Sequence, residues 1–110
     1  MTIPFQHQSL AAGKWSTFSL AEQLGNIGSE VSRAIRARGD EKRFEGCILR
    51  ALELFELTIR DSRWRKRLKE LTRAREVFCD AVLGGSEYGS SLEELDRYFY
   101  YFALAARIHR

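Results

Sequence analysis

Apolar residues recur at intervals of three and four along most of this chain, a spacing that places them on one face of an α-helix. The pattern is interrupted near Gly39, at Asp61 and Ser62, and again from Gly84 to Gly89. We therefore expect four amphipathic helices. They should cover about residues 20–38, 41–60, 64–83 and 92 to near the C-terminus.

Residues that favour helix ends stand at the borders of these segments. Ser19 with Glu22, and Ser91 with Glu94, have the spacing of a capping box, in which the serine hydroxyl accepts from the third helical amide and the glutamate reaches back. Other ends are marked by acidic residues and glycines, namely Gly39, Asp40, Asp61, Gly84 and Gly85.

Short connections between four helices favour an all-α, antiparallel four-helix bundle with up-down-up-down topology. We expect one domain, with residues 1–18 as an irregular N-terminal leader and residues 19–110 as the bundle. Gly25 and Gly28 lie inside the first helix, where each costs about 1 kcal/mol relative to alanine. They indicate a close backbone approach by a neighbouring helix.

The net charge is a modest +3. No segment approaches the roughly 20 apolar residues that span a bilayer, and the first residues do not have the pattern of a signal peptide. We expect a soluble cytoplasmic protein that does not bind membranes. Cys47 and Cys79 fall on apolar helix faces, which predicts core residues rather than a disulfide in a reducing cytosol.

Arg75 falls at the centre of the apolar stripe expected between Trp64 and Leu83. A guanidinium keeps its charge, so burial requires a carboxylate partner or a bound anion. Candidate partners at a similar height in the bundle are Asp96, which is favoured, and Glu30, with Tyr100 at the same level. We expect a polar core here, acting as a structural ion pair or, alternatively, as a small-anion pocket.

The turn between the second and third helices is the most basic part of the chain. It contains Arg60, Arg63, Arg65, Lys66 and Arg67 around a tryptophan. Such a patch can hold phosphates and bind nucleic acid in a salt-dependent manner, whereas the simpler interpretation is a solvated turn. We expect the tryptophan to pack in the core rather than stack on a base.

The fourth helix is apolar almost all round. Opposite its main stripe, Tyr101, Leu104 and Ile108 form a second ridge, and Leu49 and Leu57 on the second helix also point away from their stripe. An outer apolar ridge is typical of a surface that another chain covers. We expect a homodimer that uses the fourth helix, and contact with an unidentified protein.

Catalytic and metal chemistry find little support. The two histidines, His7 and His109, stand near the chain ends, so neither a metal site nor a general base is indicated in the body of the domain. We expect no metal and no cofactor, and a protein that is not an enzyme.

Two stretches, residues 20–31 and 67–80, resemble segments of small uncharacterised prokaryotic all-helical proteins. This resemblance implies a helical fold and a prokaryotic origin, without an activity. The bundle is also similar to the HEPN class of helical domains, some of which are RNases with an Arg-x4-6-His motif. Here Arg97 lies too far from His109 and Arg107 too close to it, which disfavours an RNase.

Overall fold

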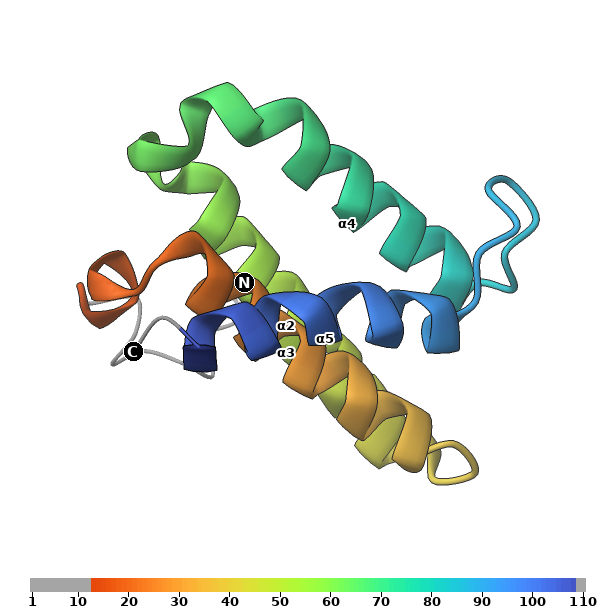
Figure 1. Cartoon of the computed structure of the whole chain (residues 1–110). Coiled ribbons are helices and arrows are strands. Elements are labelled where there is room, and N and C mark those ends of the chain that lie inside the picture. The colour runs from red at the N-terminus through yellow and green to blue at the C-terminus, as the bar shows by residue number, and fades with distance from the viewer. Residues whose placement is uncertain (1–12, 109–110) are drawn as a thin grey trace, which may run out of the picture.

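The structure is a computed structural model that describes residues 13–108, and this part of the chain is all-α, as predicted. It contains four helices, α2 (Leu20–Arg36), α3 (Glu41–Arg60), α4 (Leu68–Val82) and α5 (Leu92–Ile108). Two short 3-10 segments, η1 (Lys14–Thr17) and η2 (Ser62–Arg67), precede α2 and α4. The four helices form a compact bundle (Figure 1).

Both predicted capping boxes are present. At the start of α2, Glu22 N donates to Ser19 Oγ at 3.1 Å, and Ser19 N donates to Glu22 Oε1 at 2.9 Å. At the start of α5, Glu94 N donates to Ser91 Oγ at 3.1 Å, and Ser91 N donates to Glu94 Oε1 at 3.2 Å. Local sequence therefore determines where these helices begin.

Helix α2 is the central element, because both α3 and α5 pack extensively against it, whereas α4 contacts α3 and α5 at fewer positions. In Figure 1, α5 crosses α2 obliquely. The crossing depends on the two predicted glycines: a Cβ at Gly28 would lie 2.5 Å from Phe99 Cβ, and one at Gly25 would lie 3.0 Å from Ala103 Cα. The expected close backbone approach is confirmed.

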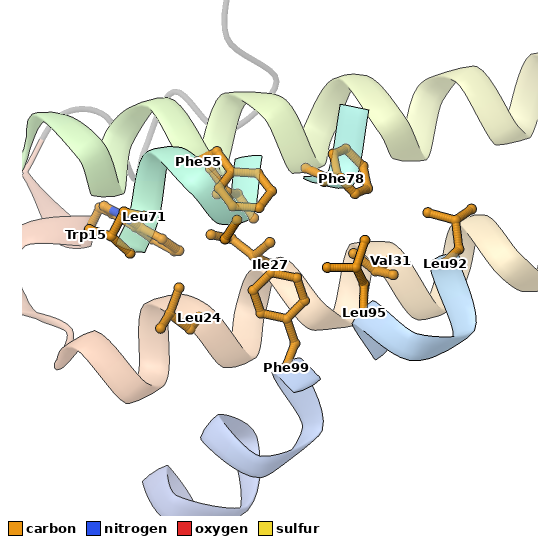
Figure 2. Packing of buried hydrophobic residues seen from close by; sticks show 13 residues of the cluster. Trp15, Leu24, Ile27, Val31, Phe55, Leu71, Phe78, Leu92, Leu95 and Phe99 are labelled. Carbon is orange, nitrogen blue, oxygen red and sulfur yellow. The ribbon is translucent and has the colours of Figure 1, made fainter. Parts of the chain in front are cut away.

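The core gathers large side chains from all four helices (Figure 2). Phe55 lies at its middle, with ring centroids 5.6 Å from Phe78 on α4 and 5.9 Å from Phe99 on α5. Ile27 of α2 lies between these rings. Because all four side chains are fully buried, this contact joins the four helices into one core.

The third helix begins later than expected. Residues Ser62–Arg67 form a 3-10 segment with non-helical backbone at Trp64, and regular α-helix starts at Leu68. The buried face of α4 is then made by Leu71, Ala74 and Phe78. This face is centred on Ala74 and not on Arg75, because Leu68, near the start of the expected stripe, is exposed.

Candidate functional site

Arg75 does not lie in the core, and this prediction was wrong. Its side chain is 46% exposed, and its Nη1 lies 3.5 Å from Glu56 Oε2 on α3. Ala74 occupies the buried position next to it. Arg75 borders an open hollow of about 540 Å³ whose lining also includes three acidic residues, Glu76, Asp80 and Glu87. These carboxylates would repel an anion, so the geometry does not make Arg75 the base of an anion pocket.

Glu30 is buried, but its partners differ from the predicted one. Its side chain is 3% exposed and forms ion pairs with Arg33 one turn later on α2 and with Arg50 Nε on α3, the latter at 2.9 Å. The buried carboxylate therefore links α2 to α3. Neither arginine was predicted as a partner of Glu30.

Asp96 and Tyr100 do not contact Arg75 either. Both line a small hollow of about 230 Å³ between α2 and α5, together with Arg107. Tyr100 is exposed, and its ring centroid lies 6.2 Å from that of Tyr101. The four residues of the expected polar core are therefore dispersed over three separate places.

A buried polar cluster that was not predicted lies at the other end of α2. Gln23 is fully buried, and its Nε2 donates to Trp15 O at 2.9 Å and to Asp61 Oδ2 at 3.1 Å. Its Oε1 accepts from Trp64 Nε1 at 2.9 Å, while Trp15 Nε1 donates to Thr58 Oγ1 at 3.1 Å. The two tryptophans could have indicated this cluster from the sequence, because a buried indole N–H requires a hydrogen-bond acceptor.

This cluster incorporates part of the expected leader into the fold. Residues Lys14–Thr17 form a 3-10 turn, and Trp15 is buried against the core, while residues 1–12 lie outside the described part of the chain. Hydrogen bonds from Arg63 and Gln23 hold the pKa of Asp61 at about 2, well below its usual range. The cluster satisfies its members internally, which indicates a structural role.

The basic turn is more neutral than its sequence suggests. Three of its arginines are each held by a carboxylate: Arg60 by Glu56 at 2.9 Å, Arg63 by Asp61 at 2.6 Å, and Arg67 by Glu70 at 2.9 Å. Arg65 and Lys66 are exposed and have no such partner among residues 13–108. Trp64 packs against the core, as expected, and Arg63 stacks on its ring at 4.4 Å.

The outer ridge of α5, defined as Tyr101, Leu104 and Ile108, is exposed as the sequence predicts. Tyr101 is 69% and Ile108 67% accessible, and Leu104 lies between them on the same face. Leu49 on α3 is also exposed. Leu57 was assigned wrongly to the outside, since it is half-buried and packs against the core.

Within residues 13–108, no group of three or more histidine, cysteine or acidic side chains is arranged to hold a metal ion. His7 and His109 lie outside the described residues. Cys47 is buried and Cys79 half-buried, and both are free thiols. None of the described helices combines the length and apolar character needed to cross a membrane.

Comparisons with known protein families, curated proteins and solved structures found no match to this chain. The resemblance to small prokaryotic helical proteins and to HEPN domains therefore stays a prediction. Function has to be argued from the surfaces of this chain itself.

Proposed function

We propose that this protein is a non-enzymatic helical interaction module that forms a homodimer through the outer ridge of α5. The observation that carries the proposal is the exposure of Tyr101, Leu104 and Ile108 on one face of a well-formed helix. Exposed apolar side chains are common singly, but three in register on one helix form a continuous strip. An unidentified protein partner would use the same strip.

A two-fold contact would cover both ridges at once. The ridge lies in the second half of α5, so two α5 helices that pack ridge against ridge meet near Leu104, and every contact occurs twice. Covering each ridge side chain contributes about 1–2 kcal/mol, since full burial of a large apolar side chain is worth about 1.5–3 kcal/mol.

The proposal is tested by light scattering coupled to size exclusion at micromolar concentrations. We expect the wild-type chain to elute with twice the chain mass of 12.7 kDa. The double variant Tyr101→Glu/Leu104→Glu should be monomeric, because it places charge on the strip. The control is Leu83→Glu, which places one negative charge on another highly exposed apolar residue, just after α4. A monomeric wild-type protein overturns the proposal.

The role of α3 is tested separately with Leu49→Glu. If the dimer contact is confined to α5, this variant remains dimeric. A monomeric Leu49→Glu variant would instead assign the contact to α3.

The alternative function, nucleic-acid binding at the basic turn, is supported by the exposed cations Arg65 and Lys66, which have no carboxylate partner in the described part of the chain. Its test is fluorescence anisotropy with single-stranded RNA and DNA at low salt, comparing wild type with Arg65→Gln/Lys66→Gln. Loss of binding in this variant supports the alternative. Undetectable binding by wild type removes it.

We also propose a cytoplasmic location. It is supported by the free thiols Cys47 and Cys79, which suit a reducing compartment. Expression of the tagged chain in cells, followed by cell fractionation, tests the proposed location directly. Recovery of the protein outside the cytoplasmic fraction contradicts the proposal.

A further inference from the structure

A second polar site lies at the opposite end of the α2–α3 pair from the basic turn. Here the last turns of α2 and the first turns of α3 enclose a hollow of about 230 Å³. Its lining contains four arginines and no acidic residue, together with two small side chains: Arg33, Arg36, Ala37, Arg43, Cys47 and Arg50. Four arginines around one small hollow give it a positive potential, which favours an anion.

Two of these arginines are held in place from beneath. The buried carboxylate of Glu30 forms ion pairs with Arg33 and with Arg50 Nε, and Arg50 Nη2 also lies 3.3 Å from Cys47 Sγ. Because Glu30 is itself almost fully buried, both guanidinium groups are fixed by a partner that cannot reorient into solvent. They form a pre-ordered base for the hollow.

The other two arginines supply positive charge that the hollow does not neutralise. Arg36 Nη1 donates to the hydroxyl of Ser32 at 2.9 Å, a neutral partner. Within residues 13–108, the guanidinium of Arg43 has no carboxylate partner, and neither does that of Arg36. The lining of the hollow therefore contains no carboxylate of its own, in contrast to the basic turn, where three arginines each pair with one.

We propose that this hollow binds a compact tetrahedral oxyanion of the phosphate class, carried by a small ligand. Arg33 and Arg50, which share the carboxylate of Glu30, supply two guanidinium groups, and the exposed side chains of Arg36 and Arg43, termed the mouth arginines, turn to the anion from α2 and α3. Arginine forks match phosphate oxygens in pairs of charge-assisted hydrogen bonds. Arg43 stands in the first turn of α3, where Asp40 already caps the helix N-terminus, so the side chain of Arg43 and not the backbone would hold the anion.

The size of the hollow selects the ligand. Sites for drug-sized molecules occupy about 300–1,000 Å³, so a hollow of about 230 Å³ suits a phosphate or diphosphate group rather than a whole nucleotide. The small extent of the hollow also favours a terminal phosphate over a nucleic-acid backbone, which needs a continuous basic track.

Binding of diphosphate, measured by isothermal titration calorimetry at moderate salt, tests the proposal. The variant is Arg36→Gln/Arg43→Gln, which removes both mouth arginines. Its matched control is Arg65→Gln/Lys66→Gln, which removes the same charge from exposed, unpaired cations of the basic turn. We expect saturable binding by wild type, a loss of roughly tenfold or more in the mouth variant, and little change in the control. Inorganic phosphate should compete.

Arginine side-chain NMR locates the anion independently of stability. On addition of diphosphate, the Nε–H resonances of Arg36 and Arg43 should shift, while that of Arg65 should not. The absence of saturable diphosphate binding, or an equal loss in both variants, would overturn the proposal. Binding of single-stranded RNA that depends on Arg36 and Arg43, without diphosphate binding, would also overturn the proposal, because the site would then recognise a nucleic-acid backbone.

Discussion

Replacing Gly28 by alanine should destabilise the protein, although alanine is the better helix former. Gly28 lies where α2 and α5 cross, and a Cβ there would stand 2.5 Å from Phe99 Cβ and 3.6 Å from the Phe99 backbone carbonyl carbon. Atoms next to the backbone cannot rotate away, and Phe99 is fully buried against Phe55. The two helices would have to separate, which loosens the core.

The magnitude follows from two opposing terms. The gain in helix propensity from glycine to alanine is about 1 kcal/mol. Overpacking a close contact costs typically about 1–3 kcal/mol, and the near-backbone position of the clash places Gly28 at or above the upper end of that range. We expect a net loss of about 2 kcal/mol, or roughly 10 °C in melting temperature for a domain of this size.

Gly46→Ala is the matched control for this substitution. Gly46 also lies inside a helix, but a Cβ there would meet only Nη1 and Nη2 of Arg50, at 3.4 and 4.0 Å, which are ordinary van der Waals distances. We expect Gly46→Ala to raise stability by up to about 1 kcal/mol. The assay is urea denaturation followed by circular dichroism. If Gly28→Ala is as stable as wild type or more stable, the close crossing of α2 and α5 is refuted.

Three further predictions concern the polar contacts. The folded state lowers the pKa of Asp61 to about 2, so its carboxylate stabilises the fold above the unfolded pKa, and this contribution is lost as the pH falls through the folded pKa. Between about pH 4 and about pH 2, the free energy of unfolding of wild type should therefore fall by about 1–2 kcal/mol more than that of Asp61→Asn, as measured by denaturation. Equal losses would contradict this. Trp15→Phe should cost about 1–3 kcal/mol, since it leaves the buried hydroxyl of Thr58 without its donor; an unchanged melting temperature would show that Trp15 is not part of the core. Arg75→Met should change the free energy of unfolding by less than about 1 kcal/mol, because the contact of Arg75 with Glu56 is solvent-exposed. Loss of folding in this variant would contradict the exposed position of Arg75.

The parts of the fold that were predictable depend on local chemistry. The capping boxes at Ser19 and Ser91 form within a single turn, so short sequence patterns determine them. Gly25 and Gly28 were informative because a helix tolerates such glycines at a cost, which a close neighbour explains. The exposed face of α5 followed from counting residues around a regular helix.

The placement of Arg75 was not predictable in the same way. It depended on which residues mark the edges of the buried face of α4. Trp64 lies in the preceding 3-10 segment and Leu68 is exposed, so neither belongs to that face. Partners of Glu30 and Gln23 are equally non-local, because each is determined by how three elements meet rather than by spacing within one. Arg50, for example, reaches Glu30 only once α3 lies against α2.

The two proposed sites lie on different elements and can be tested apart. Self-association involves α5, whereas the arginine hollow lies between α2 and α3. A monomeric α5 variant should therefore still bind diphosphate, and an Arg36→Gln/Arg43→Gln variant should still dimerise.

The most direct test of the proposed function is sedimentation velocity of the wild-type chain over a wide range of micromolar concentrations, beside Tyr101→Glu/Leu104→Glu. We predict a sedimentation coefficient and mass of a dimer for wild type, falling toward the monomer on dilution, and a monomer at every concentration for the variant. A wild-type chain that sediments as a monomer throughout, or a variant that remains dimeric, would contradict the assignment of the interface to α5.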